Sequence, residues 1–241
     1  MTPYTTAYGP PSEDWYWHMF HSVRGDVEAA TASNNAYLTI NRLGVADRSI
    51  YDKYQRSGRF WTINTYALQT TFFIAFGRIF DNRSDSFSIQ KLVEATIANP
   101  ALFSKTALLE RKRRISHITG ADPKWLVDFV GQVWEPTASD LEPLRTALAP
   151  HLDKFKAIYR PIRHKYFAHR GTESQQAIEA LFGKTLKTDV AEILGFLHTV
   201  LWAIREMALN GQRLDLTDFA DYDGEVNSVN GDIEKFIREL P

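Results

Sequence analysis

Apolar residues recur at helical spacing along most of the chain, and residues 188–210 give the clearest case. Asp189 lies in the first turn that the spacing predicts, and Gly211 follows the last, which suits a helix dipole and a glycine C-cap. The apolar positions fall on one face with a period of 3.6 residues: Val190, Ile193, Leu194, Leu197, Leu201, Ile204 and Ala208. This pattern predicts one long helix with a buried face.

A second apolar stripe begins after Thr137 or Ser139, where Asp140 and Glu142 suit the positive end of a helix. The stripe comprises Leu141, Leu144, Leu148, Leu152, Phe155, Tyr159, Ile162 and Tyr166. Three prolines, Pro143, Pro150 and Pro161, are expected to bend or interrupt this helix.

Further helices are predicted over 13–43, 59–80, 89–98 (after an N-cap at Ser88), 100–118 and 123–134, with an acidic helix after Asp221. The 59–80 helix is apolar nearly all round, which predicts a central position. No window shows the alternation of a strand bounded by turns. The sequence therefore predicts an all-α helical bundle with additional short helices. It divides into a flexible tail over 1–12, a helical domain over 13–210 and an acidic helical extension over 211–241.

The composition excludes several classes of protein. With no cysteine, the chain has no disulfide scaffold, thiolate zinc site or cysteine nucleophile, and this fits a reducing compartment. The first eleven residues lack the pattern of a signal peptide. The longest apolar runs, such as 72–76, are far short of the roughly 20 residues that cross a bilayer. We therefore expect a cytoplasmic protein without membrane contact.

The net charge of −1 conceals a local concentration of cations. Between residues 151 and 171 one acid, Asp153, is set against six basic residues: Lys154, Lys156, Arg160, Arg163, Lys165 and Arg170. Such a segment can bind a polyanion, although charge alone favours a solvated helix face. For the second cluster, at 111–114, an RNA contact and a solvated face both stay open.

Two apparent sites fail on closer inspection. Residues 182–185 resemble the end of a P-loop, but the first glycine is replaced by Ile178 and no strand precedes it. Asp14, His18 and His21 share a helix face that could hold a metal, yet no further ligand accompanies them, and an aromatic-flanked surface patch is favoured. The sequence thus predicts neither a metal nor a cofactor.

Residues 160–170 concentrate cations and imidazoles at the end of the second stripe. With helical geometry, Arg163 and His169 flank the stripe about 120° apart, whereas His164 points away from it. Tyr166 is expected to pack with the stripe. The negative end of a helix favours the protonated form of His169, which suits a group that exchanges protons near neutral pH.

This segment carries a resemblance to a known family. The run from Arg163 to His169 resembles the R-x(4–6)-H signature of HEPN domains, with a polar residue directly after the arginine. A second stretch, Gly77-Arg-Ile-Phe-Asp81 followed by Ser86-Phe-Ser-Ile-Gln-Lys-Leu92, resembles the "arginine, aromatic, aspartate, then S-x-x-x-L" block of the abortive-infection (AbiU-like) branch. The resemblance covers residues 13–210 and implies a HEPN-like helical bundle.

The resemblance implies a homodimer in which two motifs face each other, and a metal-independent endoribonuclease of the toxin or defence type. His169 is then the general base or acid, and Arg163 binds the phosphate. His164, Lys165, Arg170 and Arg160 are auxiliary RNA contacts. The chemistry is attack of a ribose 2′-OH on the adjacent phosphate, in which each proton transfer contributes about 10²–10⁴ in rate. The family also implies an antitoxin or other regulatory partner. The alternative is a non-catalytic helical bundle that binds RNA or protein, in which Arg163 pairs with an acid and His169 caps carbonyls.

Overall fold

The computed structural model describes residues 12–168, 174–217 and 220–240. Within these ranges the regular structure is helical and contains no strand, so the predicted all-α class is confirmed. The predicted tail at 1–12 lies outside the described residues except for Ser12, which caps the first helix by accepting from the Trp15 N–H.

The helices follow one another in the order α1 (Glu13–Ala46), α2 (Arg48–Arg56), α3 (Gly58–Ile79), α4 (Ile89–Ala98), a 3₁₀ turn (Pro100–Phe103), α5 (Lys105–Ile115), α6 (Lys124–Gln132), α7 (Ala138–Leu141), α8 (Pro143–Lys154), a π-helical turn (Phe155–Tyr159), α9 (Arg160–Ile162), a second π-helical turn (Arg163–Ala168), α10 (Gln175–Phe182), α11 (Lys187–Asn210) and α12 (Ala220–Glu239). The sequence did not predict α2 and α10.

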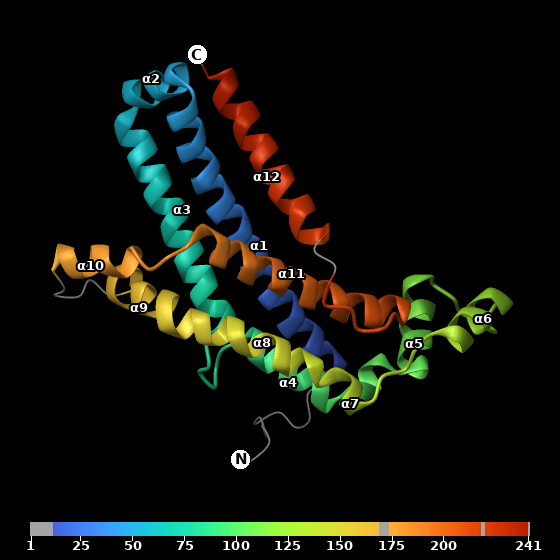
Figure 1. Ribbon diagram of the computed structural model, residues 1–241. Coiled ribbons are helices and arrows are strands. Elements are labelled where there is room, and N and C mark those ends of the chain that lie inside the picture. The colour runs from blue at the N-terminus through green and yellow to red at the C-terminus, as the bar shows by residue number, and fades with distance from the viewer. Residues whose placement is uncertain (1–11, 169–173, 218–219, 241) are drawn as a thin grey trace.

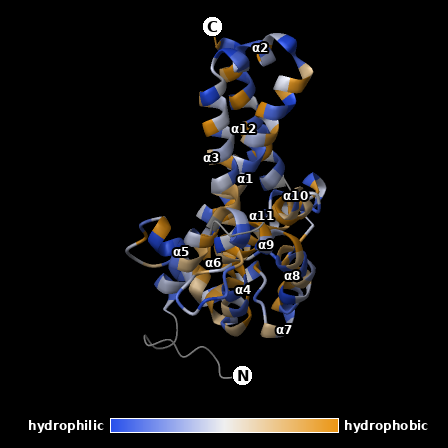
Figure 2. Ribbon diagram, turned by 90° about the vertical axis from the view of Figure 1, so that its left-hand side faces the viewer, coloured by the Kyte–Doolittle hydropathy of each residue, from blue (hydrophilic) through white to orange (hydrophobic). Residues whose placement is uncertain are grey.

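A helical arm projects from a broader base. The arm consists of the second half of α1, all of α2, the first half of α3 and α12, as Figures 1 and 2 show. The base holds the large core, formed mainly by α1, α3, α4, α8 and α11. A small separate core stabilises the arm through Ile40, Leu43, Ile50 and Ile237, and another joins α5 to α6 through Leu108, Leu126 and Val130.

The central helix of the base is α11. Both the face predicted from the sequence and neighbouring positions such as Phe196 and Val200 are buried. The helix ends as predicted at Gly211, which adopts the left-handed conformation with φ +58°, and its N–H donates to the Met207 carbonyl. This extensive burial follows from the position of α11 in the base, where α1, α5 and α12 contact it, and Trp202 and Arg205 stay only partly buried (Figure 1).

The central position predicted for the 59–80 helix is correct only for its second half. From Phe72 to Ile79, α3 is largely buried. In the first half, Phe60, Ile63 and Tyr66 are 53%, 67% and 52% exposed. The physical reason is that this half belongs to the arm, where too few helices surround it to cover every face.

The prolines act differently from one another. Pro143 occupies the first turn of α8, where a missing N–H costs nothing, and Pro150 lies inside the same helix without ending it. Before Pro161 the chain widens into a π-helical turn in which the Arg160 N–H donates to the Phe155 carbonyl. This wider turn suits a position where proline cannot donate to the carbonyl four residues before it.

The acidic C-terminal segment forms α12, which packs along α1. The Thr39 hydroxyl donates to the Asn230 side-chain oxygen over 2.6 Å, and Arg42 forms an ion pair with Glu234. The division of the chain at residue 210 stays a prediction. None of the helices in the described ranges combines the length and the apolarity that crossing a bilayer requires.

The buried His151 of α8 makes stability depend on pH. Its ring stacks on Phe196 with centroids 4.1 Å apart, and burial, with a smaller contribution from Lys154, lowers the pKa of His151 despite the opposing charge of Glu192. The unfolded chain therefore binds a proton at this histidine more readily than the folded protein does. The folded state is most stable above about pH 6.5, where His151 is neutral in both states, and its stability declines as the pH falls towards the lowered pKa. We expect the free energy of unfolding to vary less over this window in His151→Leu than in the wild type, measured by urea unfolding at several pH values. The exposed His21→Leu is the control, and an unchanged pH dependence in His151→Leu would contradict the assignment.

Candidate functional site around Arg163

The segment that carries the predicted motif is fixed to α3 by pairs of aromatic rings. Phe155 stacks on Phe80 with centroids 4.5 Å apart, Tyr159 meets Phe76 edge-on at 5.3 Å, and Phe167 stacks on Phe73 at 4.6 Å. Residue numbers rise along one partner as they fall along the other, so the two segments run antiparallel. We call these three pairs the aromatic ladder. Each such pair adds about 0.5–1.5 kcal/mol beyond the area that it buries.

The part of the motif that the structure describes, Arg163–Ala168, forms the second π-helical turn, and this corrects the predicted packing of Tyr166. Phe155, Tyr159 and Ile162 are buried as the stripe predicts, but Tyr166 is 37% exposed. Phe167 takes its place against α3. In a π-helical turn the backbone bonds join residues five apart. The next residue after Ile162 on the packed face is therefore Phe167, five positions on, and not Tyr166, four positions on.

Arg163 lies at the edge of the packed face, as the sequence predicts, and is partly buried. Its side chain crosses α3 at Gly77. The Nε atom is buried and has no hydrogen-bond partner, and Arg163 forms no ion pair with a carboxylate of the described residues. The alternative in which Arg163 pairs with an acid therefore finds no support within the described part of the chain.

The other cations of the segment divide into two groups. Lys156, Arg160, His164 and Lys165 are exposed, and the exposure of His164 agrees with its predicted position away from the packed stripe. Lys154, in contrast, donates to Asp189 over 2.9 Å and to Glu192 over 3.0 Å, and these bonds raise the pKa of Lys154. His169 and Arg170 lie outside the described residues, so the structure leaves their predicted roles as predictions.

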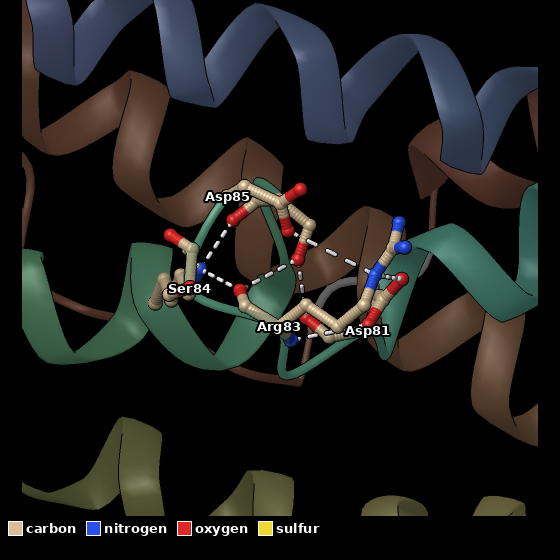
Figure 3. Close-up of polar contacts among 6 residues, drawn as sticks. Asp81, Arg83, Ser84 and Asp85 are labelled. Atoms are coloured by element: carbon tan, nitrogen blue, oxygen red, sulfur yellow. Dashed lines mark hydrogen bonds and ion pairs between the residues drawn. The ribbon is translucent and has the colours of Figure 1, made fainter.

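The second stretch of the resemblance forms the turn between α3 and α4. Asp81 accepts from the backbone N–H and from the Nε of Arg83, each over 3.1 Å, and Figure 3 shows the Arg83 side chain turned back towards Asp81 with Asp85 nearby. The hydroxyl of Ser86 donates to the carbonyls of Asp81 and Arg83 over 3.1 and 3.0 Å. These bonds make a compact turn at the end of α3.

Helix α4 completes this turn from the other side. Lys91 donates to three carbonyls of the turn, those of Arg83, Ser84 and Ser86. Partial burial lowers the pKa of Lys91, opposed by the charges of Asp81 and Asp85. Ser88 accepts from the Lys91 N–H as the predicted N-cap, and both Ser88 and Leu92 are fully buried. The S-x-x-x-L block thus has a structural role.

The arginine cluster at 111–114 is also largely structural, which settles part of the question that the sequence left open. Arg111 is 4% exposed and donates to Glu13 and to the carbonyls of Leu102 and Ala208. Arg113 forms a bidentate pair with Asp122, with both N···O distances 2.6 Å. Arg114 is the exposed member and lies 3.8 Å from Glu13.

Other groups that could act chemically are used for packing. The exposed His18 ring packs edge-on against Phe87, and the described residues contain no group of three or more side chains arranged to hold a metal. Thr31, His198 and Asp221 are joined in the order of a catalytic triad by two contacts of 3.0 Å. The Thr31 side chain is fully buried, so these groups stabilise the contact between α1, α11 and α12.

Sequence reasoning missed two residues of this site, Phe167 and Gly77. Phe167 was missed because α-helical spacing was continued through a π-helical turn. Gly77 could have been found from the sequence. A glycine inside an apolar helix weakens that helix, and it often marks a place where another segment approaches the helix backbone closely.

The fold is an all-α bundle, and a comparison with known families gives its class. The family model of AbiU2, a HEPN family, matches residues 19–201, about three quarters of the chain, and includes α3, the aromatic ladder and Arg163. The chain therefore belongs to the AbiU2 family of HEPN proteins. No curated protein and no solved structure gives a significant match.

The π-helical register makes Phe167 and Tyr166 differ in their effect on stability. We expect Phe167→Ala to lower the free energy of unfolding by about 2–3 kcal/mol, because the change removes the stack on Phe73 and opens a gap beside α3. Tyr166→Ala should cost less than about 1 kcal/mol because its ring is more exposed. Urea unfolding of both variants checks this order. The reverse order would show that the α-helical register is correct.

Proposed function

We propose that the protein is a metal-independent endoribonuclease whose site is built around Arg163 and His169. The observation that carries the proposal is the placement of Arg163. The aromatic ladder holds it at the edge of a packed face, and it forms no ion pair with the described residues. Arg160, His164 and Lys165 are exposed on the same segment. A fixed guanidinium among exposed cations suits a phosphodiester.

The reaction needs three functions from the protein. One imidazole removes the proton from a ribose 2′-OH, which attacks the adjacent phosphorus as the bond to the 5′-oxygen breaks. A guanidinium stabilises the charge on the phosphoryl oxygens, and a second proton donor protonates the leaving 5′-oxygen. We assign the proton transfers to His169, with its counterpart from a second subunit, and the charge stabilisation to Arg163. The products carry a 2′,3′-cyclic phosphate and a 5′-hydroxyl.

The requirement for a 2′-OH selects RNA over DNA. Arg160, His164, Lys165 and Arg170 are the auxiliary contacts that we propose for flanking phosphates. We propose that this activity is cytoplasmic.

A homodimer would bring two such sites together, and the structure offers a surface for it. Phe60, Ile63 and Tyr66 form an exposed apolar row along the arm half of α3. Tyr66 lies 6.4 Å from the Phe167 ring between centroids, so the row continues into the motif segment. We propose that a second copy of the chain buries this row, next to the motif segment of each subunit. We propose that a separate regulatory protein, such as an antitoxin, restrains the activity.

A non-catalytic bundle that binds RNA or protein is the second candidate, and the same apolar row favours it. Exposed aromatic side chains on a projecting arm suit a protein partner as well as a second copy. The two functions differ in what happens to bound RNA: the enzyme cleaves it, and the binding protein leaves it intact.

The first test is RNA cleavage by the purified protein in excess EDTA, with analysis of the product ends. We expect cleavage that survives chelation and leaves 2′,3′-cyclic phosphates. His169→Ala should lower kcat by about 10²–10⁴, because it removes a proton transfer. Arg163→Ala should lower kcat by about 10²–10³, because it removes charge stabilisation.

Matched controls are Arg56→Ala and His21→Ala, which remove an exposed arginine and an exposed histidine outside the motif segment. Both should cleave like the wild type. If folded wild-type protein leaves several classes of RNA intact, the ribonuclease proposal is wrong and the binding function is the remaining candidate.

The dimer is tested by a charge placed in the apolar row. Ile63→Glu should convert the dimer to a monomer in sedimentation or light-scattering measurements and reduce cleavage with it. A glutamate buried at an interface without a partner is strongly unfavourable. Val45→Glu, at a position that is 91% exposed and away from the row, is the control. A wild-type protein that is monomeric at high concentration would contradict this arrangement.

A further inference from the structure

The contact between Gly77 and Arg163 leaves no room for a Cβ atom unless the arginine side chain moves. Gly77 is buried in the second half of α3. A Cβ atom built on it would lie 2.2 Å from the Arg163 Nε, 2.3 Å from its Cδ and 3.1 Å from its Cζ. Real Cβ atoms essentially never approach a heavy atom within 3.0 Å. The middle of the Arg163 side chain therefore occupies the volume that a Cβ would fill.

Space, rather than backbone conformation, explains the glycine. Among the described glycines the left-handed conformation occurs at Gly211, whereas Gly77 has ordinary helical geometry that alanine would favour. At Gly25 and Gly131, which also lie in helices, a Cβ would meet nothing within 4 Å. Gly77 therefore destabilises its helix relative to alanine, and the space left by its missing Cβ is filled by Arg163.

The contact is steric and not polar. The Arg163 Nε is buried without a hydrogen-bond partner, which is unfavourable for the folded state. The Arg163 side chain lies in a channel over the bare backbone of α3 at Gly77, and the Phe76–Tyr159 and Phe73–Phe167 pairs of the aromatic ladder hold the two segments together on either side. A packed channel of this kind restricts the rotamers of a long side chain.

We propose that Gly77 is the positioning residue for Arg163. The missing Cβ opens the channel through which the arginine stem crosses α3, and this fixes where the guanidinium emerges. The consequence for RNA cleavage rests on the proposed function, in which Arg163 stabilises charge on the phosphate. The positioning itself is a property of the fold and is measurable without RNA.

The direct test is Gly77→Ala followed by the side-chain Nε–H resonance of Arg163 in a ¹⁵N–¹H spectrum, assigned by its absence in Arg163→Lys. A buried Nε–H exchanges slowly with water and gives an observable signal. We expect the signal to shift or to be lost by exchange in Gly77→Ala, because the arginine is displaced from the channel. Gly25→Ala should leave it unchanged. An unmoved signal in folded Gly77→Ala would overturn the proposal.

A double-mutant cycle covers the case in which Gly77→Ala is folded but too unstable for the spectrum. Gly77→Ala should lower the Tm when Arg163 is present. In the Arg163→Ala background the same change should leave the Tm equal or higher, because the clash is gone and alanine favours the helix. If Gly77→Ala destabilises both backgrounds equally, Gly77 does not act through Arg163.

Cleavage assays then separate the two proposals. If the wild type cleaves RNA, Gly77→Ala should lower kcat on the order of 10²-fold with little change in KM, as a displacement of about 1 Å can do. The Gly77→Ala/Arg163→Ala protein should be no slower than Arg163→Ala. If the wild type does not cleave RNA while the resonance and the cycle behave as expected, the proposed function fails and the positioning stands. Full cleavage by Gly77→Ala, with an unmoved resonance, refutes the positioning alone.

Discussion

The antiparallel packing of residues 155–167 on α3 is the interaction on which the site depends. Three aromatic pairs set the separation and register of the two segments, from Phe80–Phe155 at one end to Phe73–Phe167 at the other. Because rings pack with little freedom, the position of every residue between them is determined as well. The partial burial of Arg163, its contact with Gly77 and the exposure of the other cations all follow from this register.

Sequence periodicity predicts most of this fold because most of it is regular. The apolar face of α11, its end at Gly211 and the N-cap at Ser88 follow from spacing and from helix-end chemistry, and the structure confirms each of them. Periodicity fails where the helix itself changes. The two π-helical turns on either side of α9 add a residue to the local repeat. A stripe with a period of 3.6 residues therefore predicts that Tyr166 is packed, whereas the packed residue is Phe167. Pro161 marks the place of the change in the sequence, although not its extent.

Charge patterns in the sequence do not distinguish a cation used in the fold from one left at the surface. The cluster at 111–114 looks as basic as the motif segment, yet Arg111 is buried against carbonyls and Arg113 is held by Asp122. Within the motif segment Lys154 is likewise held by two carboxylates, whereas Arg160 is exposed. The difference depends on acids and carbonyls that are distant in the sequence, so it becomes visible only when the helices are packed.

The Gly77–Arg163 contact combines two features that each weaken a fold. A glycine inside a helix is less favourable than alanine by about 0.5–1 kcal/mol, and a buried donor without a partner costs about 1–3 kcal/mol. A purely structural arginine would avoid both, as Arg111 does by bonding to two carbonyls and a carboxylate. Local departures from the rules of stability are concentrated at functional sites, where selection maintains a geometry for another reason. The contrast between these two arginines of one chain is the reason why we propose a functional role for Arg163 rather than a structural one.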